Sequence, residues 1–177
     1  RWRPGTASGL TPTFRWHPQR LIRTIAGAMS EAERDGVVAI ASDHGGFDLK
    51  QLLSQELVTL GYQVLDLGTH GAESVDYPTY AEAMADALLS GRARRGVLLC
   101  GTGIGVSIAA NRRPGIRAAL CHNVETARLA RQHNNANILA LGGRTTDAGT
   151  AKAVLRAFLD TAFADGGRPA RRVAMMG

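Results

Sequence analysis

Five short apolar runs, each followed by a segment of helical period, constrain the fold of this chain more than any other feature. The apolar runs, rich in leucine and β-branched residues, occupy residues 37–42, 63–67, 97–100, 116–120 and 137–141. The helical periods follow at residues 47–60, 77–90, 105–111, 124–132 and 146–164. Successive strand-helix units are typical of a parallel sheet covered by helices on both faces. The sequence therefore predicts an α/β fold with a five-stranded parallel sheet.

Glycines and threonines mark several of the predicted boundaries. Gly61 and Gly91 stand directly after the first two helical segments, where a left-handed residue commonly ends a helix. Thr145 or Thr146 is the expected cap of the last long helix. These signals support one domain over residues 35–177.

The basic charge of the chain is concentrated at its start. The formal net charge is +6, but residues 1–30 hold five arginines and no acidic residue, which leaves 16 basic against 15 acidic residues afterwards. This segment shows no sustained period, so residues 1–34 are predicted to be a disordered leader. A translated leader upstream of Met29 and an arginine-rich organellar transit peptide are the two alternatives. The nearly neutral remainder predicts no nucleic-acid partner.

Two further properties bear on location. The longest apolar runs are far shorter than the roughly 20 residues of a membrane span, so no membrane association is expected. Cys100 and Cys121 lie 21 residues apart without a CxxC motif, which disfavours a structural zinc site and a disulfide framework. Free thiols favour a cytoplasmic protein.

The loops that follow the first and third strands carry the most reactive side chains. A doubly wound sheet of five strands usually has the order 3-2-1-4-5 or 2-1-3-4-5, and ligands bind at the carboxyl ends where the order reverses. In the second order, strands one and three are neighbours at that crevice. Their loops read Asp43-His44-Gly45-Gly46 and Gly101-Thr102-Gly103-Ile104-Gly105.

Cys100 stands at the start of the glycine-rich loop. Three alternating glycines let backbone N–H groups turn toward an oxyanion or a phosphate, although glycines alone are as often a sign of tight strand-helix packing. A thiol beside such donors is a usable base or nucleophile. A free cysteine is more often a buried core residue, and Cys121 keeps that interpretation.

Histidines and arginines near the predicted strand ends are weaker candidates. His44 is placed to bind phosphate or transfer a proton, or simply to begin a helix. His133 ends the fourth helix, where the helix dipole alone favours a histidine. Arg168 and Arg172 form either a solvated tail or a phosphate clamp.

Taken together and in order, these motifs resemble the ribose-5-phosphate isomerase B family, which includes the galactose-6-phosphate isomerase subunits. The resemblance runs from about Val37 to Val173. It rests on residues 43–47, 76–78, 100–105, 109–111, 115–118, 131–134, 167–168 and 172–173. It implies a flavodoxin-like three-layer αβα sandwich with strand order 2-1-3-4-5. It also implies a homodimer, or a tetramer, with an active site shared between subunits, and neither a metal nor an organic cofactor.

The resemblance also implies roles for individual residues. Cys100 is the base that moves a proton between C2 and C1 of an open-chain sugar phosphate, and Thr102 assists. His133 opens the sugar ring and Asn134 binds a hydroxyl. The remaining substrate contacts are Asp43 with the sugar, His44, Arg144, Arg168 and Arg172 with phosphate, and Gly101, Gly103, Ile104 and Gly105 with the enediolate oxygens. Some family members use a carboxylate at another position as the base.

The predicted function is the interconversion of D-ribose 5-phosphate and D-ribulose 5-phosphate in the pentose phosphate pathway. Alternatives are an isomerase for allose 6-phosphate, galactose 6-phosphate or a tetrose phosphate, and a catalytically silent phosphate-binding subunit. A silent subunit is disfavoured because Cys100, His133 and Arg168 are all present. A dinucleotide oxidoreductase is disfavoured because the glycine-rich loop follows the third strand rather than the first.

Overall fold

The computed structural model describes residues 36–176 and contains the predicted parallel sheet. The leader predicted over residues 1–34 lies outside the described residues, so the division of the chain into a leader and a domain stays a prediction. The strands are β1 (Val37–Ser42), β2 (Gln63–Asp66), β3 (Arg95–Cys100), β4 (Ala118–Leu120) and β5 (Ile138–Gly142). All neighbouring strands pair in parallel.

The order of the strands is β2-β1-β3-β5-β4, which corrects the predicted order 2-1-3-4-5 at its last two positions. β5 pairs with β3, with Val97 beside Leu139 and Leu99 beside Leu141. All five residues of β5 are buried, whereas the three residues of β4 are only partly buried. The longer and more apolar strand therefore takes the central place, and the short strand forms the edge.

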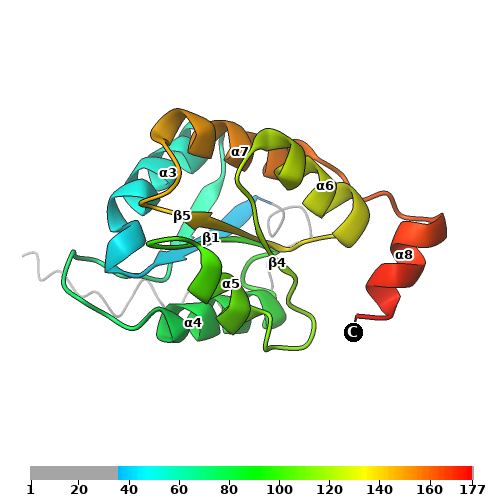
Figure 1. The fold of residues 1–177 in the computed structure, drawn as a ribbon, viewed down its shortest axis with the longest axis horizontal. Coiled ribbons are helices and arrows are strands. Elements are labelled where there is room, and N and C mark those ends of the chain that lie inside the picture. The colour runs from blue at the N-terminus through cyan, green and yellow to red at the C-terminus, as the bar shows by residue number, and fades with distance from the viewer. Residues whose placement is uncertain (1–35, 177) are drawn as a thin grey trace, which may run out of the picture. The chain divides into compact units, whose positions relative to one another are not determined.

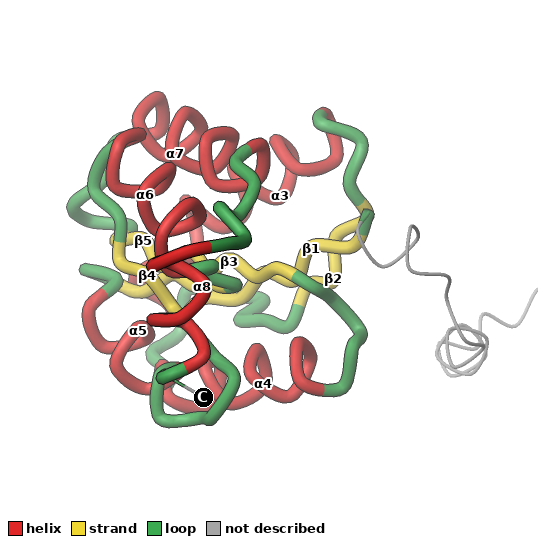
Figure 2. The backbone as a smooth tube through the Cα atoms, turned by 90° about the vertical axis from the view of Figure 1, so that its right-hand side faces the viewer, coloured by secondary structure: helices red, strands yellow, loops and turns green. Residues whose placement is uncertain are grey.

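Helices cover both faces of the sheet, as predicted for an αβα sandwich (Figures 1 and 2). One face is covered by α3 (Phe47–Thr59), α6 (Val124–Asn134) and α7 (Ala148–Asp160). The other face is covered by α4 (Tyr77–Leu89) and α5 (Ile104–Ala110). A short 3-10 turn, η1 (His44–Gly46), links β1 to α3. The fold class is thus confirmed.

A last helix, α8 (Gly167–Ala174), was missed in the sequence, where this segment reads as a short tail. None of its residues is buried, so the helix is not part of the core of this chain. Figure 1 shows it beside the end of α6 and outside the two helical layers.

Two of the predicted helix boundaries are confirmed and one is corrected. Gly61 and Gly91 have positive φ angles of 88° and 75°. The N-cap of α7 is Asp147, whose side chain accepts a hydrogen bond from the Thr150 N–H at 2.9 Å. Thr145 and Thr146 belong instead to the turn after β5, where both backbone N–H groups donate to the carbonyl of Gly142.

The larger core lies between the sheet and the layer of α3, α6 and α7. Leu53, Leu57 and Phe158 are fully buried there against Ile40 and Leu139 of the sheet. Apolar side chains of this size each contribute about 1.5–3 kcal/mol when removed from water. Within residues 36–176, no helix is both long enough and apolar enough to cross a membrane.

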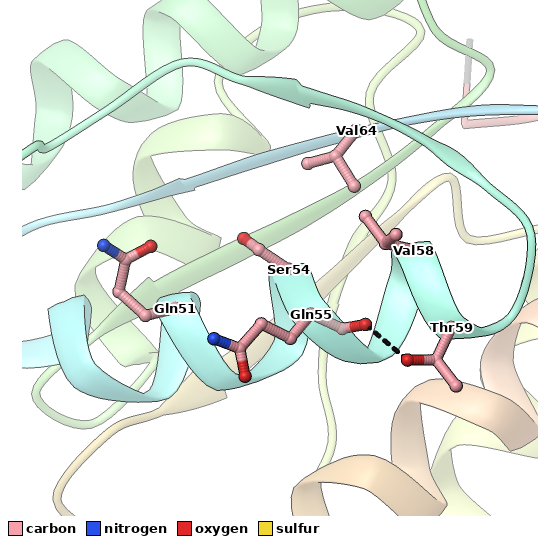
Figure 3. Close-up of a pocket in the computed structure, with 6 residues that line it drawn as sticks. All are labelled: Gln51, Ser54, Gln55, Val58, Thr59 and Val64. Atoms are coloured by element: carbon pink, nitrogen blue, oxygen red, sulfur yellow. Dashed lines mark hydrogen bonds between the residues drawn. The ribbon is translucent and has the colours of Figure 1, made fainter.

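A surface groove lies between α3 and the edge strand β2 (Figure 3). It is lined by Gln51, Ser54, Gln55, Val58, Thr59 and Val64. None of these residues is among the predicted site residues. The groove follows the edge strand β2, and the reactive loops lie elsewhere.

Candidate active site

Three loops meet at the carboxyl ends of β1, β3 and β5. The N–H of Asp43 donates to the carbonyl of Leu99 at 3.1 Å. The N–H groups of Gly143 and Arg144 donate to the carbonyls of Cys100 and Gly101 at 2.8 and 2.9 Å. The loops after the first and third strands are therefore neighbours, as predicted, and the loop after β5 is bonded to them. We call the place where these three loops meet the crevice.

The loops approach each other closely through backbone atoms. A Cβ atom at Gly143 would lie 2.4 Å from the carbonyl oxygen of Gly45, and one at Gly45 would lie 3.0 Å from the N of Gly101. Side chains at these positions would push the loops apart. We call Gly45, Gly101 and Gly143 the glycine contact. Glycines therefore stand in the loops that follow three separate strands.

Cys100 lies at the base of this crevice with 5% of its surface exposed. Its Sγ accepts a hydrogen bond from the Gly103 N–H at 3.1 Å. Gly103 has φ 77°, and a Cβ atom there would lie 2.6 Å from Cδ1 of Leu120. Glycine is therefore needed for the turn that aims this N–H at the sulfur. The Gly103 N–H thus fixes the position of the sulfur at the start of the glycine-rich loop.

Three further side chains lie on the rim of the glycine-rich loop. Thr102 is exposed, and its hydroxyl oxygen accepts the Ile104 N–H at 3.4 Å. Arg144 is exposed, and its Cδ and Nε lie 3.5 and 3.6 Å from the position of a Cβ atom on Gly101. The ring of Tyr77 covers Gly105, at 2.7 Å from a Cβ atom there. Tyr77 lies in residues 76–78, one of the segments that carry the family resemblance, but the resemblance implies no role for it.

Asp43 and His44 lie on the opposite side of the crevice. Asp43 is buried, and its Oδ1 accepts the Gly46 N–H at 3.1 Å, so this carboxylate also caps the turn η1. Nδ1 of His44 accepts the Val75 N–H at 3.2 Å. A neutral His44 therefore carries its proton on Nε2, which is then available to donate to an anion.

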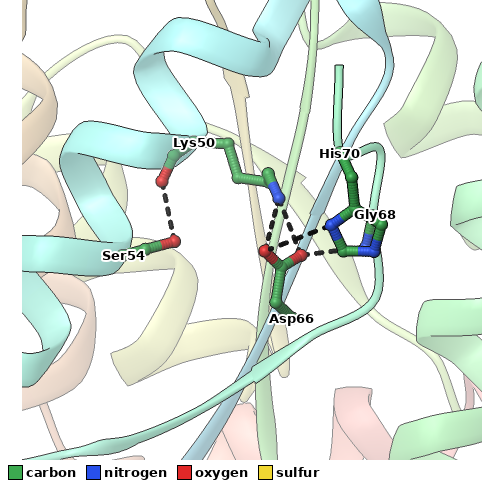
Figure 4. A network of polar contacts seen from close by, with 5 residues as sticks. All are labelled: Lys50, Ser54, Asp66, Gly68 and His70. Carbon is green, nitrogen blue, oxygen red and sulfur yellow. Dashed lines mark hydrogen bonds and ion pairs between the residues drawn. The ribbon is translucent and has the colours of Figure 1, made fainter. Parts of the chain in front are cut away.

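A buried ion pair supports the loop that follows β2 (Figure 4). Lys50 is fully buried, and its Nζ lies 2.7 and 2.6 Å from the two carboxylate oxygens of Asp66. Asp66 also accepts the Gly68 N–H at 2.9 Å, and Gly68 accepts the Ser42 N–H at 2.7 Å. This pair was missed, although Lys50, Leu53 and Leu57 share one helical face. A lysine on an apolar face was the available signal.

The other predicted residues lie near the amino ends of the strands, which we call the amino edge of the sheet, as opposed to the carboxyl edge where the three loops meet. α6 follows the parallel strand β4 and runs back along the sheet, so His133 and Asn134 at its end lie near the amino ends of the strands. Three residues beyond Asn134, the carbonyl of Asn137 accepts the N–H of Gly96 at the start of β3. β3 alone separates this edge from Cys100 by about 16 Å at the usual rise of a strand.

The helix α8, which carries Arg168 and Arg172, lies beside the end of α6, which carries His133 (Figure 1). The Ala164 N–H donates to the carbonyl of Gln132 at 3.1 Å, which ties the segment before α8 to the end of α6. Both arginines are exposed. The predicted site thus divides within one chain. The carboxyl-edge group is Asp43, His44, Cys100, Gly101, Thr102, Gly103, Ile104, Gly105 and Arg144; the amino-edge group is His133, Asn134, Arg168 and Arg172.

Cys121 has the environment of a core residue, as predicted. It is 1% exposed, and burial raises the pKa of its thiol to about 11. Both cysteines are free. The cytoplasmic location stays a prediction.

Comparison with known proteins identifies the family of the chain. The family model described as Ribose/Galactose Isomerase matches residues 38–176. Ribose-5-phosphate isomerase B of Escherichia coli is 44% identical over 136 residues, which cover 77% of this chain and 91% of that protein. A solved structure of Clostridium thermocellum ribose-5-phosphate isomerase B is 50% identical with a TM-score of 0.78, covering 80% of this chain and 95% of the other.

Relatives of nearly equal similarity have other names. D-erythrulose-4-phosphate isomerase of Pectobacterium atrosepticum is 41% identical over 141 residues, covering 79% of this chain and 92% of that protein. Galactose-6-phosphate isomerase subunit LacB of Clostridium acetobutylicum is 42% identical over 127 residues, covering 72% and 73%. With its parallel sheet, its glycine-rich loop after β3 and these relatives, the chain belongs to the ribose/galactose isomerase family of sugar phosphate isomerases.

Proposed function

We propose that this chain interconverts D-ribose 5-phosphate and D-ribulose 5-phosphate, with Cys100 as the base. The observation that carries the proposal is the 3.1 Å hydrogen bond from the Gly103 N–H to Sγ of Cys100 at the start of the glycine-rich loop. The two relatives compared above that are named for ribose 5-phosphate share 44% and 50% of their residues with this chain. The reaction belongs to the pentose phosphate pathway.

The proposed chemistry is a proton transfer between adjacent carbons. The Cys100 thiolate takes the proton from C2 of the open-chain aldose, and the electron pair of that bond forms the C1–C2 double bond as the carbonyl oxygen becomes an enediolate oxyanion. The thiol then returns the proton to C1. The hydroxyl proton of O2 moves to O1, assisted by Thr102. One base on one face can perform both steps, and backbone N–H donors stabilise the oxyanion by a few kcal/mol.

We further propose that two copies of the chain form a homodimer in which the carboxyl-edge group of one copy meets the amino-edge group of the other. Ring opening by His133 and binding of phosphate by Arg168 and Arg172 require these residues beside Cys100. In one chain they lie at the other edge of the sheet. A two-fold axis brings the two groups together twice, since such an interface is self-complementary.

The exposed face of α5 fits such an interface. Ile104 and Ile108 lie one helical turn apart with 51% and 61% of their surface exposed. Both belong to the helix that directly follows the glycine-rich loop. Apolar side chains at the centre of an interface are typically those that a partner covers. Light scattering of the purified protein tests the dimer, and a monomer at working concentration would contradict it.

A coupled assay with added chelator tests the substrate. Ribose 5-phosphate is compared with allose 6-phosphate, galactose 6-phosphate and erythrose 4-phosphate. The highest kcat/KM is expected for ribose 5-phosphate. A higher kcat/KM for another of these sugar phosphates would contradict the proposed substrate and remain consistent with the proposed proton transfer, since relatives with other names are nearly as similar to this chain. Absence of turnover with all four would favour a silent phosphate-binding subunit.

Substitution of Cys100 tests the base. Cys100→Ala is expected to lower kcat by at least about 1,000-fold, because the step has no other base. Cys121→Ala is the matched control, since this second buried thiol lies at the end of β4 and outside the crevice. Near-normal turnover by the Cys100 variant would refute its role as the base.

A further inference from the structure

Arg131 is a buried charged residue that the proposed mechanism does not use. Only 7% of its surface is exposed, and its guanidinium lies 5.7 Å from the centre of the Phe158 ring. Burial lowers its pKa to about 10, with smaller contributions from Arg95 and Arg117. It therefore remains a cation at neutral pH. A buried cation costs stability unless its donors are satisfied, so its partners indicate what it does.

One side of the guanidinium holds the turn that follows Asn134. Nη1 of Arg131 donates to Oδ1 of Asn135 at 2.9 Å and to the carbonyl of Ala136 at 2.6 Å. Asn135 has φ 45° and ψ 42°, the left-handed conformation that ends α6. Its carbonyl accepts a second arginine, Nε of Arg117, at 3.0 Å. The residue directly after Asn134 is thus fixed through both its side chain and its backbone.

The other side holds the segment that leads to α8. Nε of Arg131 donates to the carbonyl of Thr161 at 3.3 Å, directly after α7. The Ala164 N–H donates to the carbonyl of Gln132, the next residue along α6. Arg131 and its neighbour therefore tie residues 161–164 to the end of α6. Arg168 and Arg172 follow on α8 without any buried residue of that helix to anchor it.

We propose that Arg131 is a positioning residue for the amino-edge group. A single guanidinium fixes the turn behind His133 and Asn134 and also the start of the segment that carries Arg168 and Arg172. This inference rests on the proposed function, because it assumes that these residues act on the substrate. The planar fork of arginine donates in two directions at once, which the point charge of lysine does not reproduce. Arg131 itself touches no substrate.

The first test compares substitutions at two arginines of α6. Arg131→Lys keeps the charge and removes the fork, and Arg131→Met removes both. We expect kcat/KM to fall at least 10-fold in both variants while the lysine variant still forms the folded dimer. Arg128→Met is the matched control, since Arg128 is exposed and pairs with Glu125 at 2.9 Å on the same helix, and it should stay within twofold. Wild-type kinetics for Arg131→Lys would overturn the proposal.

Mixed dimers distinguish positioning from a general loss of stability. Cys100→Ala lacks the carboxyl-edge base, and Arg131→Lys is expected to lack only an ordered amino-edge group. When the two inactive variants are unfolded, mixed in equal amounts and refolded, half of the dimers are hybrids with one intact site each. Activity should recover to about a quarter of the wild-type level, since the sites of a two-fold dimer are equivalent.

The control mixtures separate this proposal from the one on which it rests. Cys100→Ala with His133→Ala should also recover, whereas Arg131→Lys with His133→Ala should not, because both substitutions impair the amino-edge group. Recovery only for Cys100→Ala with His133→Ala would refute the role of Arg131 and leave the shared site standing. Recovery in none of the mixtures would refute the shared site and the role of Arg131 together.

Discussion

The pair of Lys50 and Asp66 provides a stability prediction that depends on which partner is removed. Lys50 is fully buried, whereas the side chain of Asp66 is 33% exposed. Asp66→Asn leaves a buried ammonium without its counter-charge. It keeps Oδ1, so the hydrogen bond from the Gly68 N–H is retained. The substitution therefore measures the contribution of the Asp66 charge to stability, separately from the hydrogen bond that holds the loop after β2.

The expected loss of folding free energy for each substitution follows from the unequal burial of Lys50 and Asp66. Removing one partner of a fully buried pair costs about 3–5 kcal/mol, and water at the exposed third of Asp66 reduces this to about 2–3 kcal/mol. For a chain of this length the melting temperature should fall by about 5–10 °C. Lys50→Met removes the buried charge and leaves a partly hydrated carboxylate, so it should cost less, about 1 kcal/mol.

Urea unfolding followed by circular dichroism, at one fixed protein concentration, measures both effects. The double variant with Lys50→Met and Asp66→Asn should be more stable than Asp66→Asn alone, because the uncompensated charge is gone. The reasoning would be wrong if Asp66→Asn cost less than about 0.5 kcal/mol, the usual range of a surface substitution. A larger loss for Lys50→Met than for Asp66→Asn would refute it as well.

Two further predictions concern a glycine and a buried carboxylate. Gly103→Ala should abolish activity and cost more stability than Gly61→Ala. Both glycines have positive φ, but only Gly103 has a neighbour, Leu120, within 4 Å of an added Cβ atom. Thermal melts and activity assays of the two variants test this prediction, and equal losses of stability would contradict it. The hydrogen bond from Arg156 lowers the pKa of Glu56 below its ordinary value of 4.5. The stability that the ionised Glu56 contributes is present above pH 4.5 and is lost as the pH falls, so the stability advantage of the wild type over Glu56→Gln should shrink below about pH 4.5. An equal stability difference at neutral and acid pH would contradict it.

The elements of the fold were predictable from the sequence because each has a local signal. The run VVAIAS is apolar up to its final serine, and the structure places β1 at residues 37–42 as predicted. The order of β4 and β5 was not predictable in this way, because an apolar run shows that a strand is buried but not which strands lie beside it. α8 was missed because its amphipathic turns bury nothing in the chain.

The candidate site was predicted as a set of residues and not as an arrangement. The carboxyl-edge group follows from loops at the ends of adjacent strands, and the structure joins these loops by hydrogen bonds. The separation of His133 from Cys100 was available from topology, since a helix after a parallel strand returns to the amino edge. The roles of Lys50 and Arg131 required the structure, because each depends on contacts with segments distant in the sequence.

The glycine contact has a consequence for how such enzymes diverge. A Cβ atom at Gly45 or Gly143 would come within 3.0 Å of backbone atoms of a neighbouring loop, so no side chain at these two positions is available to alter the shape of the crevice. A Cβ atom at Gly101 would meet only the side chain of Arg144, at 3.5 Å. Selection for a longer or shorter sugar must therefore act on the exposed rim, where Thr102 and Arg144 lie. Substrate preference can then change while these glycines stay the same, which fits the three different names of relatives that share more than 40% of their residues with this chain.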